Sequence, residues 1–207
     1  MPLIRLGCFF LISITFGFSQ TYAADQPPNL APLTTLYDYQ LIDSQTKKVI
    51  SLKTLVKQLA DKEILFIGEF HGNPAVHLFQ AQLQAALFQQ NDQQVLSMEQ
   101  FNRDQQAILN QYLDSEIGEK TLVKEAPAWQ NYVASYRPLV EFAKQHFIPV
   151  IAANAPADVV RCVGRHGKPY IKKLTKDESA YLPKDPFYSD PAYQAQFQQF
   201  MQQGASH

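Results

Sequence analysis

Three continuous apolar runs, each followed by polar residues, constrain the fold of this chain more than any other feature. The runs cover residues 64–67, 95–98 and 148–153. Apolar residues that follow one another without alternation are typical of strands buried on both faces, as in a parallel sheet covered by helices. Helical patterns separate the runs, and this alternation predicts an α/β fold with a mostly parallel sheet flanked by helices.

The segments around these runs carry weaker patterns. Asn73 followed by Pro74 is typical of a helix start, and apolar residues at helical spacing continue to about residue 90. After residue 167 the periodicity fades, so we expect mostly loop at 177–191 and a helical C-terminal extension at 192–203. The many glutamines are expected to lie on the solvated surface. We also expect short strands at 36–42 and 46–51 and helices at 52–59, 103–113 and 127–146.

The N-terminus is predicted to be a secretory signal peptide, residues 1–23. One positive charge, at Arg5, precedes an apolar stretch at 6–18 that is too short to span a membrane, and small residues stand at the −3 and −1 positions of a cleavage site after Ala23. The alternative is a cytosolic chain with an apolar first helix. A polar, proline-rich linker at 24–34 then leads to the α/β domain, 35–207.

Composition narrows the classes of function. Hydrophobic residues make up 46% of the 207 residues, charged residues 18%, and the formal net charge is −1. A neutral chain of this kind does not favour binding to nucleic acid through bulk charge. Of the two cysteines, Cys8 lies inside the predicted signal peptide and lacks a working lipobox, so Cys162 is expected to be a structural thiol without an internal disulfide.

Polar side chains follow each apolar run at the point where the strand should end. Glu69 and His71 follow the first run, Glu99 the second and Asn154 the third. The carboxyl ends of parallel strands meet at one edge of a sheet, so these groups are expected to line one crevice. Together they can bind a divalent metal or act as acid and base. The alternative is that the carboxylates cap helices or pair with Arg103 and lysines.

Two other groups are candidates for the same site. His77 lies in the first turn of the helix after Pro74 and faces either this crevice or solvent. Tyr136 and Arg137 are adjacent: a phenolate can bind ferric iron and a guanidinium can hold a carboxylate. The helical spacing of Trp129, Tyr132 and Tyr136 is more often that of core residues.

The order of these motifs resembles the ChaN-like haem-binding uptake proteins, a branch of the superfamily that includes the Tiki metalloproteases and the erythromycin esterases. The resemblance is carried by the segments 68–75, 97–103, 129–139 and 148–156. Superfamily members share a Gly-x-x-His after the first strand, a glutamate after the second and another Gly-x-x-His near the C-terminus. Gly68 to His71 matches the first motif and Glu99 the glutamate. Gly204 to His207 has the residues of the last motif but follows a helical pattern and not an apolar strand. The family's C-terminal part is therefore expected to be missing.

The resemblance implies a periplasmic protein of bacterial haem and iron uptake. It implies haem held at a homodimer interface with a tyrosine at the iron, and an outer-membrane haem receptor system as partner. Tyr136 is the preferred ligand, with Tyr132 and Tyr188 as alternatives. The expected haem-binding residues are Tyr136, Arg137, His77, His71 and Asn154, and the iron ligands are expected among Tyr136 and His71.

Three functions remain open from the sequence. The first is a non-enzymatic haem carrier. The second is a metal-dependent hydrolase of esterase or peptidase type, with a divalent metal, His71 as ligand or acid/base, Glu99 as general base, and Glu69 completing the catalytic set. The third is an interaction module that keeps the crevice without using it.

Overall fold

The computed structural model describes residues 30–126 and 129–204. The predicted signal peptide with Cys8, the first part of the linker, and His207 of the last Gly-x-x-His lie outside the described residues. Within them, no helix is long and apolar enough to cross a membrane.

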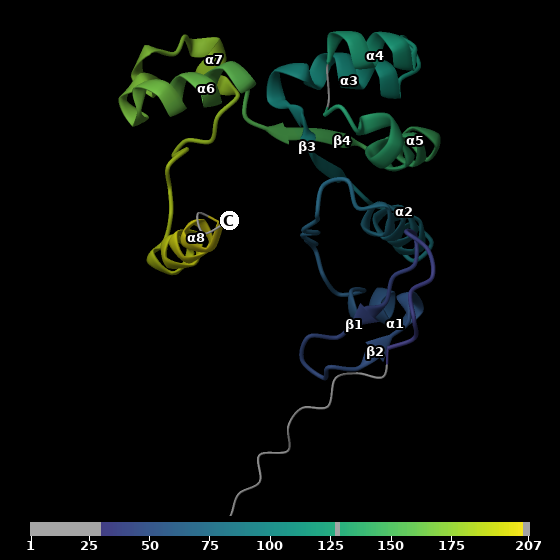
Figure 1. Ribbon diagram of the computed structural model, residues 1–207. Coiled ribbons are helices and arrows are strands. Elements are labelled where there is room, and N and C mark those ends of the chain that lie inside the picture. The colour runs from purple at the N-terminus through teal and green to yellow at the C-terminus, as the bar shows by residue number, and fades with distance from the viewer. Residues whose placement is uncertain (1–29, 127–128, 205–207) are drawn as a thin grey trace, which may run out of the picture.

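Two of the three predicted parallel strands are present. β3 (Leu96–Asn102) and β4 (Val150–Asn154) form a parallel pair (Figure 1). The register aligns Leu96 with Val150 and Met98 with Ala152, and it shifts before Asn102 pairs with Asn154. Helices flank this pair, so the α/β class with a parallel sheet is confirmed. Burial alternates along β4, from buried Val150 and Ala152 to exposed Ile151 and Ala153, so the expected burial on both faces is not found.

The helices between the two strands are the 3-10 turn η1 (Arg103–Gln105), α3 (Gln106–Leu113), α4 (Glu119–Glu125), the π-helical turn η2 (Tyr132–Tyr136) and α5 (Arg137–Gln145). α2 (Pro74–Phe88) precedes β3 and packs against α5 and η2. In place of the single helix expected at 127–146, a π-helical turn at Tyr132–Tyr136 runs directly into α5. Pro138, in the first turn of α5, has no N–H to bond the preceding turn, which favours a local departure from α-helical hydrogen bonding.

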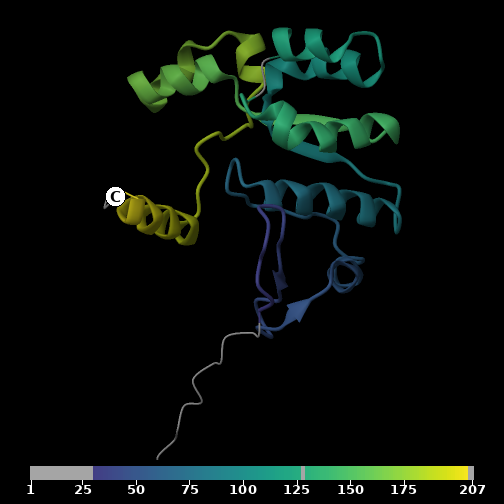
Figure 2. The same ribbon diagram turned by 45° about the vertical axis from the view of Figure 1, so that its right-hand side comes forward.

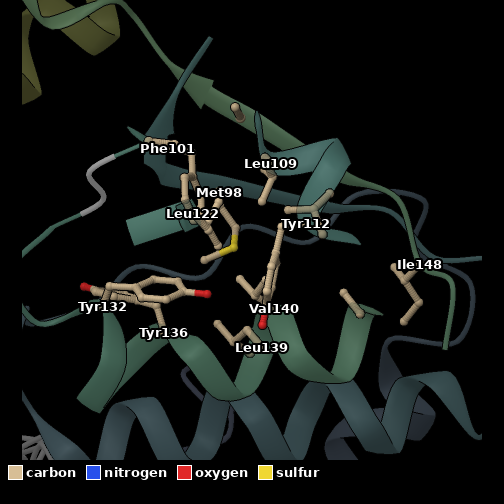
Figure 3. Close-up of a cluster of buried hydrophobic side chains, with 14 residues drawn as sticks. Met98, Phe101, Leu109, Tyr112, Leu122, Tyr132, Tyr136, Leu139, Val140 and Ile148 are labelled. Carbon is tan, nitrogen blue, oxygen red and sulfur yellow. The ribbon is translucent and has the colours of Figure 1, made fainter. Parts of the chain in front are cut away.

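The hydrophobic core lies where β3, β4 and α5 meet. Met98 and Phe101 of β3 pack there with Leu139 and Val140 of α5, and Figure 3 shows these side chains converging between the strand and the helix. Leu109 and Tyr112 of α3, Leu122 of α4, and Tyr132 and Tyr136 of η2 complete the cluster. The buried residues of this cluster come from β3 onward along the chain, and Ala81 and Phe88 of α2 pack against it.

The N-terminal part forms a smaller unit beside α2. β1 (Leu41–Ile42) and β2 (Val49–Ile50) are a short antiparallel pair, as expected at 36–42 and 46–51. α1 (Leu52–Gln58) follows, capped by the Ser51 hydroxyl, which accepts from the backbone N–H of Thr54, and it packs against α2.

The prediction of a first buried strand at 64–67 is wrong. These residues pair with no strand of the described chain, and their side chains are exposed: Ile64 is 73% and Phe66 90% exposed. The run is part of the long curved loop between α1 and α2 (Figure 1). An apolar run becomes a buried strand only when a neighbouring strand satisfies its backbone and helices cover its faces.

The C-terminal part is helical. α6 (Ala157–His166), the 3-10 turn η3 (Lys168–Lys173) and α7 (Lys176–Ala180) follow β4, so α7 enters the segment expected to be loop. α8 (Pro191–Gly204) agrees with the expected helical extension. Both ribbon views show α8 standing away from the other helices (Figures 1 and 2).

Candidate functional site

The site starts at the tight turn that joins the 64–67 run to α2. Gly72 has a φ of +82°, a left-handed conformation that glycine adopts without a steric cost. Asn73 then caps α2, its side-chain oxygen accepting from the N–H groups of Ala75 at 3.0 Å and Val76 at 3.2 Å. This turn fixes Glu69 and His71 against the first turns of α2, although no strand precedes them.

Glu69 is the centre of a buried polar cluster. Its side chain is only 8% exposed. Oε1 accepts hydrogen bonds from the Tyr136 hydroxyl at 2.5 Å and from His71 Nδ1 at 2.8 Å, with Gln100 Nε2 at 3.4 Å. Oε2 accepts from Gln80 Nε2 at 2.7 Å. These donors replace the hydrogen bonds that water would give to the carboxylate, so its ionised form is stable.

His77 is buried behind this carboxylate, not on the surface. Its Nε2 accepts from the backbone N–H of Gly72 at 3.3 Å, and its Nδ1 lies 3.0 Å from Gln80 Oε1. Since Gln80 donates its amide to Glu69, its oxygen must be the acceptor from His77. These partners assign one tautomer to His77 and use both ring nitrogens, so His77 holds the turn and the carboxylate in place.

The cluster changes two pKa values. Burial acts to raise the pKa of Glu69, but hydrogen bonds from Tyr136, Gln80 and His71 outweigh it and hold the pKa below its ordinary value. Burial, together with the hydrogen bond to Glu69, raises the pKa of Tyr136 to about 12. The Tyr136 phenol is therefore neutral at physiological pH, and its proton lies between the phenol and the carboxylate.

His71 differs from the rest of the cluster because its ring reaches solvent. The side chain is 54% exposed. Its Nδ1 is engaged by Glu69, and its ring stands edge-on to Trp129, with the ring centroids 4.4 Å apart. The other nitrogen, Nε2, is then the lone-pair position that can face a ligand.

A cleft of about 990 Å³ opens beside the cluster. One wall is the segment 59–71, another is residues 93–100 of β3 and its approach, and α2 and α5 also contribute side chains. Glu69, His71 and Tyr136 are among the lining residues. The apolar lining includes Leu59, Ile64, Leu65, Ile67, Leu83, Leu87, Val95, Leu96 and Leu139.

The predicted site residues divide into two groups. Glu69, His71, His77 and Tyr136 lie together, and Glu99 lines the same cleft from an exposed position on β3.

The other predicted residues do not line this cleft. Arg137 points to α4, where its Nε lies 2.8 Å from Glu119 Oε1. Asn154 ends β4 opposite Asn102, and its side-chain oxygen accepts from the N–H of Ala155. Tyr132 is buried in the core, and Tyr188 is exposed in the segment before α8.

Sequence reasoning missed the glutamines. Gln80 and Gln100 both donate to Glu69, and Gln84 is buried with its amide on the Leu139 carbonyl, contrary to the expectation of a solvated surface. A signal was present: His77, Gln80 and Gln84 recur at helical spacing on α2, which places them on one face.

The arrangement does not favour the hydrolase. Among residues 30–126 and 129–204, no group of three or more His, Cys, Asp or Glu side chains could hold a metal ion. Catalytic zinc sites use three such protein ligands. The Glu69 oxygens are already occupied by hydrogen bonds, which leaves His71 and the exposed Glu99.

Comparison with known proteins gives one match. A family model described as "Haem-binding uptake, Tiki superfamily, ChaN" matches residues 55–207, a range that includes the whole cluster and all of the cleft lining. Searches of curated proteins and of solved structures found no match.

Proposed function

Because this chain belongs to the haem-binding uptake family of the Tiki superfamily, the ChaN family, we propose that it binds haem in the cleft between residues 59–71 and β3. We propose further that it acts as a non-enzymatic carrier, so that haem is its cargo. The family assignment supports haem as the ligand. The geometry of the cleft supports this location for the haem-binding site.

The exposed apolar run is the observation that carries this proposal. Ile64, Leu65 and Ile67 are exposed to solvent and also line the cleft. Clustered apolar side chains that face water usually mark a binding surface. A flat apolar ligand that enters the cleft would remove these side chains from water, which contributes about 25 cal/mol for each Å² of apolar surface buried.

The cleft fits a ligand of the size and chemistry of haem. Its volume, about 990 Å³, is at the upper end of small-molecule sites, which span roughly 300–1,000 Å³. Aliphatic side chains such as Ile64, Leu83 and Leu96 line part of its walls and could pack against the porphyrin faces, beside a similar number of polar and charged residues. His71 is one of these polar residues and presents an imidazole. Bound haem would supply an iron centre, and these residues would bind the macrocycle, orient it and exclude water from its faces.

Hemin titration of the purified protein tests the proposal. We expect a shifted Soret band that saturates at a fixed stoichiometry. Ile67→Asp should weaken binding by roughly ten- to a hundredfold, because it removes an apolar contact of about 1.5–3 kcal/mol from the cleft wall. Phe66→Asp is the matched control, since Phe66 is adjacent, 90% exposed and not part of the lining. Unchanged free-hemin spectra would refute haem binding, and equal effects of the two variants would place the haem elsewhere.

The setting of this activity is also a proposal. We propose that residues 1–23 direct export and that the mature chain works in the periplasm, which cell fractionation with and without these residues would test. The homodimer and the outer-membrane receptor partner stay predictions. Size-exclusion chromatography before and after hemin addition would detect a haem-dependent dimer as a shift to twice the mass.

A further inference from the structure

We propose that a basic surface on α6, η3 and the first residue of α7 binds an anionic membrane, with its cations facing the phosphate groups of the lipids. The side chains of this basic surface are all exposed, and they are Arg161, Arg165, Lys168, Lys172, Lys173 and Lys176. None of them lines the cleft, so the inference is independent of haem binding. It concerns where the protein works and not what it carries.

Charge is distributed unevenly along this chain. Residues 157–176 contain six of its 18 basic residues and one of its 19 acidic residues, which gives this segment a formal net charge of +5. The chain as a whole has a net charge of −1, so the residues outside this segment sum to −6. A basic segment in an otherwise acidic chain indicates an anionic partner at that place, because the rest of the molecule repels such a partner.

The fold places these charges on the outside of one end of the molecule. α6 is amphipathic: Val159 is 5% exposed and faces the protein, whereas Arg161 and Arg165, one helical turn apart, are exposed. η3 packs against α6 and exposes Lys172 and Lys173. Both ribbon views show α6 and α7 together at this end (Figures 1 and 2). The basic side chains therefore form one accessible surface.

The acidic groups of the protein leave most of this charge available. In the part of the chain that the structure describes, Arg161 is the only member of the basic surface in an ion pair, and its partner is Asp158. Glu178, in the first turn of α7, turns back to its own helix start and accepts from the N–H of Thr175 at 2.7 Å. An external partner is thus needed to neutralise the remaining cations.

Exposed tyrosines beside the basic surface favour a membrane over an acidic protein as this partner. The segment after α7 returns to η3, where Nζ of Lys168 lies 5.1 Å from the centroid of the Phe187 ring. Tyr188 follows Phe187 and is 77% exposed, so it stands close to the basic surface. Tyrosine collects at the headgroup level of membranes, because its ring is apolar and its hydroxyl is polar. Basic amphipathic helices are likewise typical of membrane surfaces.

Sedimentation of the purified full chain with lipid vesicles tests the proposal. The vesicles are made of phosphatidylcholine, with and without the anionic lipid phosphatidylglycerol. At low ionic strength we expect the protein to sediment with the anionic vesicles and to stay in solution with the neutral ones. We expect it to be released at about 1 M salt, where the Debye length falls to about 3 Å.

Two charge-reversed variants show whether the basic surface is responsible. Each cation near an anionic membrane strengthens binding about fivefold, so Lys172→Glu combined with Lys173→Glu should weaken it roughly thirtyfold or more. Lys53→Glu combined with Lys57→Glu is the matched control, since it changes the net charge equally at an exposed pair on α1. This control should change binding a few-fold at most. Tyr188→Ala keeps every charge and should weaken binding by a smaller factor than the first variant. Circular dichroism of each variant checks the fold.

Four results would overturn the inference. If the chain binds neither type of vesicle, the basic surface has no affinity for lipid. Equal binding to both types would mean that apolar contacts, and not these cations, hold the protein on the membrane. Equal losses in the two double variants would assign the effect to net charge. Binding to polyglutamate without binding to vesicles would make the partner an acidic protein. Hemin titration tests the proposed function separately from all of these.

Discussion

The first and third apolar runs are alike in sequence and differ in structure. Residues 148–153 contain β4, which pairs with β3 and buries Val150 and Ala152. Residues 64–67 are as apolar but pair with no strand of the described chain, and all four side chains are exposed. The difference shows that apolar character predicts an extended segment, while its burial depends on what lies on both sides of it.

The surroundings of the two runs explain the difference. β4 has β3 as a hydrogen-bonding neighbour, and the side-chain amide of Gln106 at the start of α3 bonds both the Val150 carbonyl and the Ala152 N–H. The 64–67 run contributes to the cleft lining and pairs with no strand of the described chain. Its attachment to the core comes after the run, through Glu69 and the donors around it.

Hydrogen exchange should show the largest contrast between the runs. The amides of β3 and β4 take part in the parallel ladder and should exchange only on global unfolding, while those of 64–67 should exchange at nearly the rate of an unfolded peptide. With a global stability of at least about 5 kcal/mol, the ratio of rates exceeds roughly a thousandfold. Mass spectrometry of peptic fragments measures it.

Equal protection of the two runs from exchange would contradict the structural difference between them. Protection of 64–67 without added ligand would mean that a strand pairs with it in solution. If protection of 64–67 appears only with hemin, this run is the part of the chain that the ligand orders.

Two phenylalanines give a matched test of stability. Phe101 on β3 is fully buried in the core, and Phe66 is 90% exposed. Phe101→Ala should lower the free energy of unfolding by about 3–5 kcal/mol, because it leaves a cavity. Phe66→Ala should change it by less than about 0.5 kcal/mol. Urea unfolding measures both, and a comparable cost at Phe66 would contradict its exposure.

Local signals predicted much of the fold correctly. Asn73 and Pro74 mark the start of α2, and the runs at 95–98 and 148–153 contain the beginning of β3 and most of β4. The failures concern partners that are distant in sequence. The pairing of a strand, such as the absent one at 64–67, depends on a neighbour that local pattern does not specify. The π-helical turn before α5 could have been expected from Pro138, which the sequence contains.

Sequence reasoning named several residues that meet at the cleft, but not what each of them does there. The strand-end argument expected Glu69, His71, Glu99 and Asn154 in one crevice. The first three line the cleft, although no strand is formed at 64–67 and Glu99 lies inside β3 and not at its end. Asn154 does not line it. That argument could not foresee that Gln80 and Tyr136 satisfy Glu69, since a buried hydrogen-bond network depends on side-chain geometry between α2 and η2. Tyr136 and Arg137 are adjacent in sequence and were expected at one site. In the structure Tyr136 bonds Glu69, and Arg137 pairs with Glu119.

Tyr136→Phe tests how the 64–71 segment is attached to the core. The phenol donates to an ionised carboxylate at 2.5 Å, and hydrogen bonds to charged groups contribute about 1.5–3 kcal/mol. We expect a loss of stability in that range, together with faster exchange around Glu69. The isosteric ring keeps the core packing, so Tyr112→Phe, which removes the hydroxyl bonded to Glu141 on the other side of the core, is a matched control that should leave exchange at Glu69 unchanged.

Asn73→Ala should have the smallest effect on stability. It tests whether the turn at 69–73 is ordered independently of the 64–67 run before it. Asn73 caps α2 by accepting from Ala75 and Val76, and losing such a cap costs about 1 kcal/mol of stability. Asn73→Asp keeps the acceptor and should restore most of it. If α2 alone positions Glu69 and His71, the loss of the cap should loosen both while exchange at 64–67 stays as fast as before. Slower or faster exchange at 64–67 in this variant, measured by the same fragment analysis, would show that the run is ordered together with the turn.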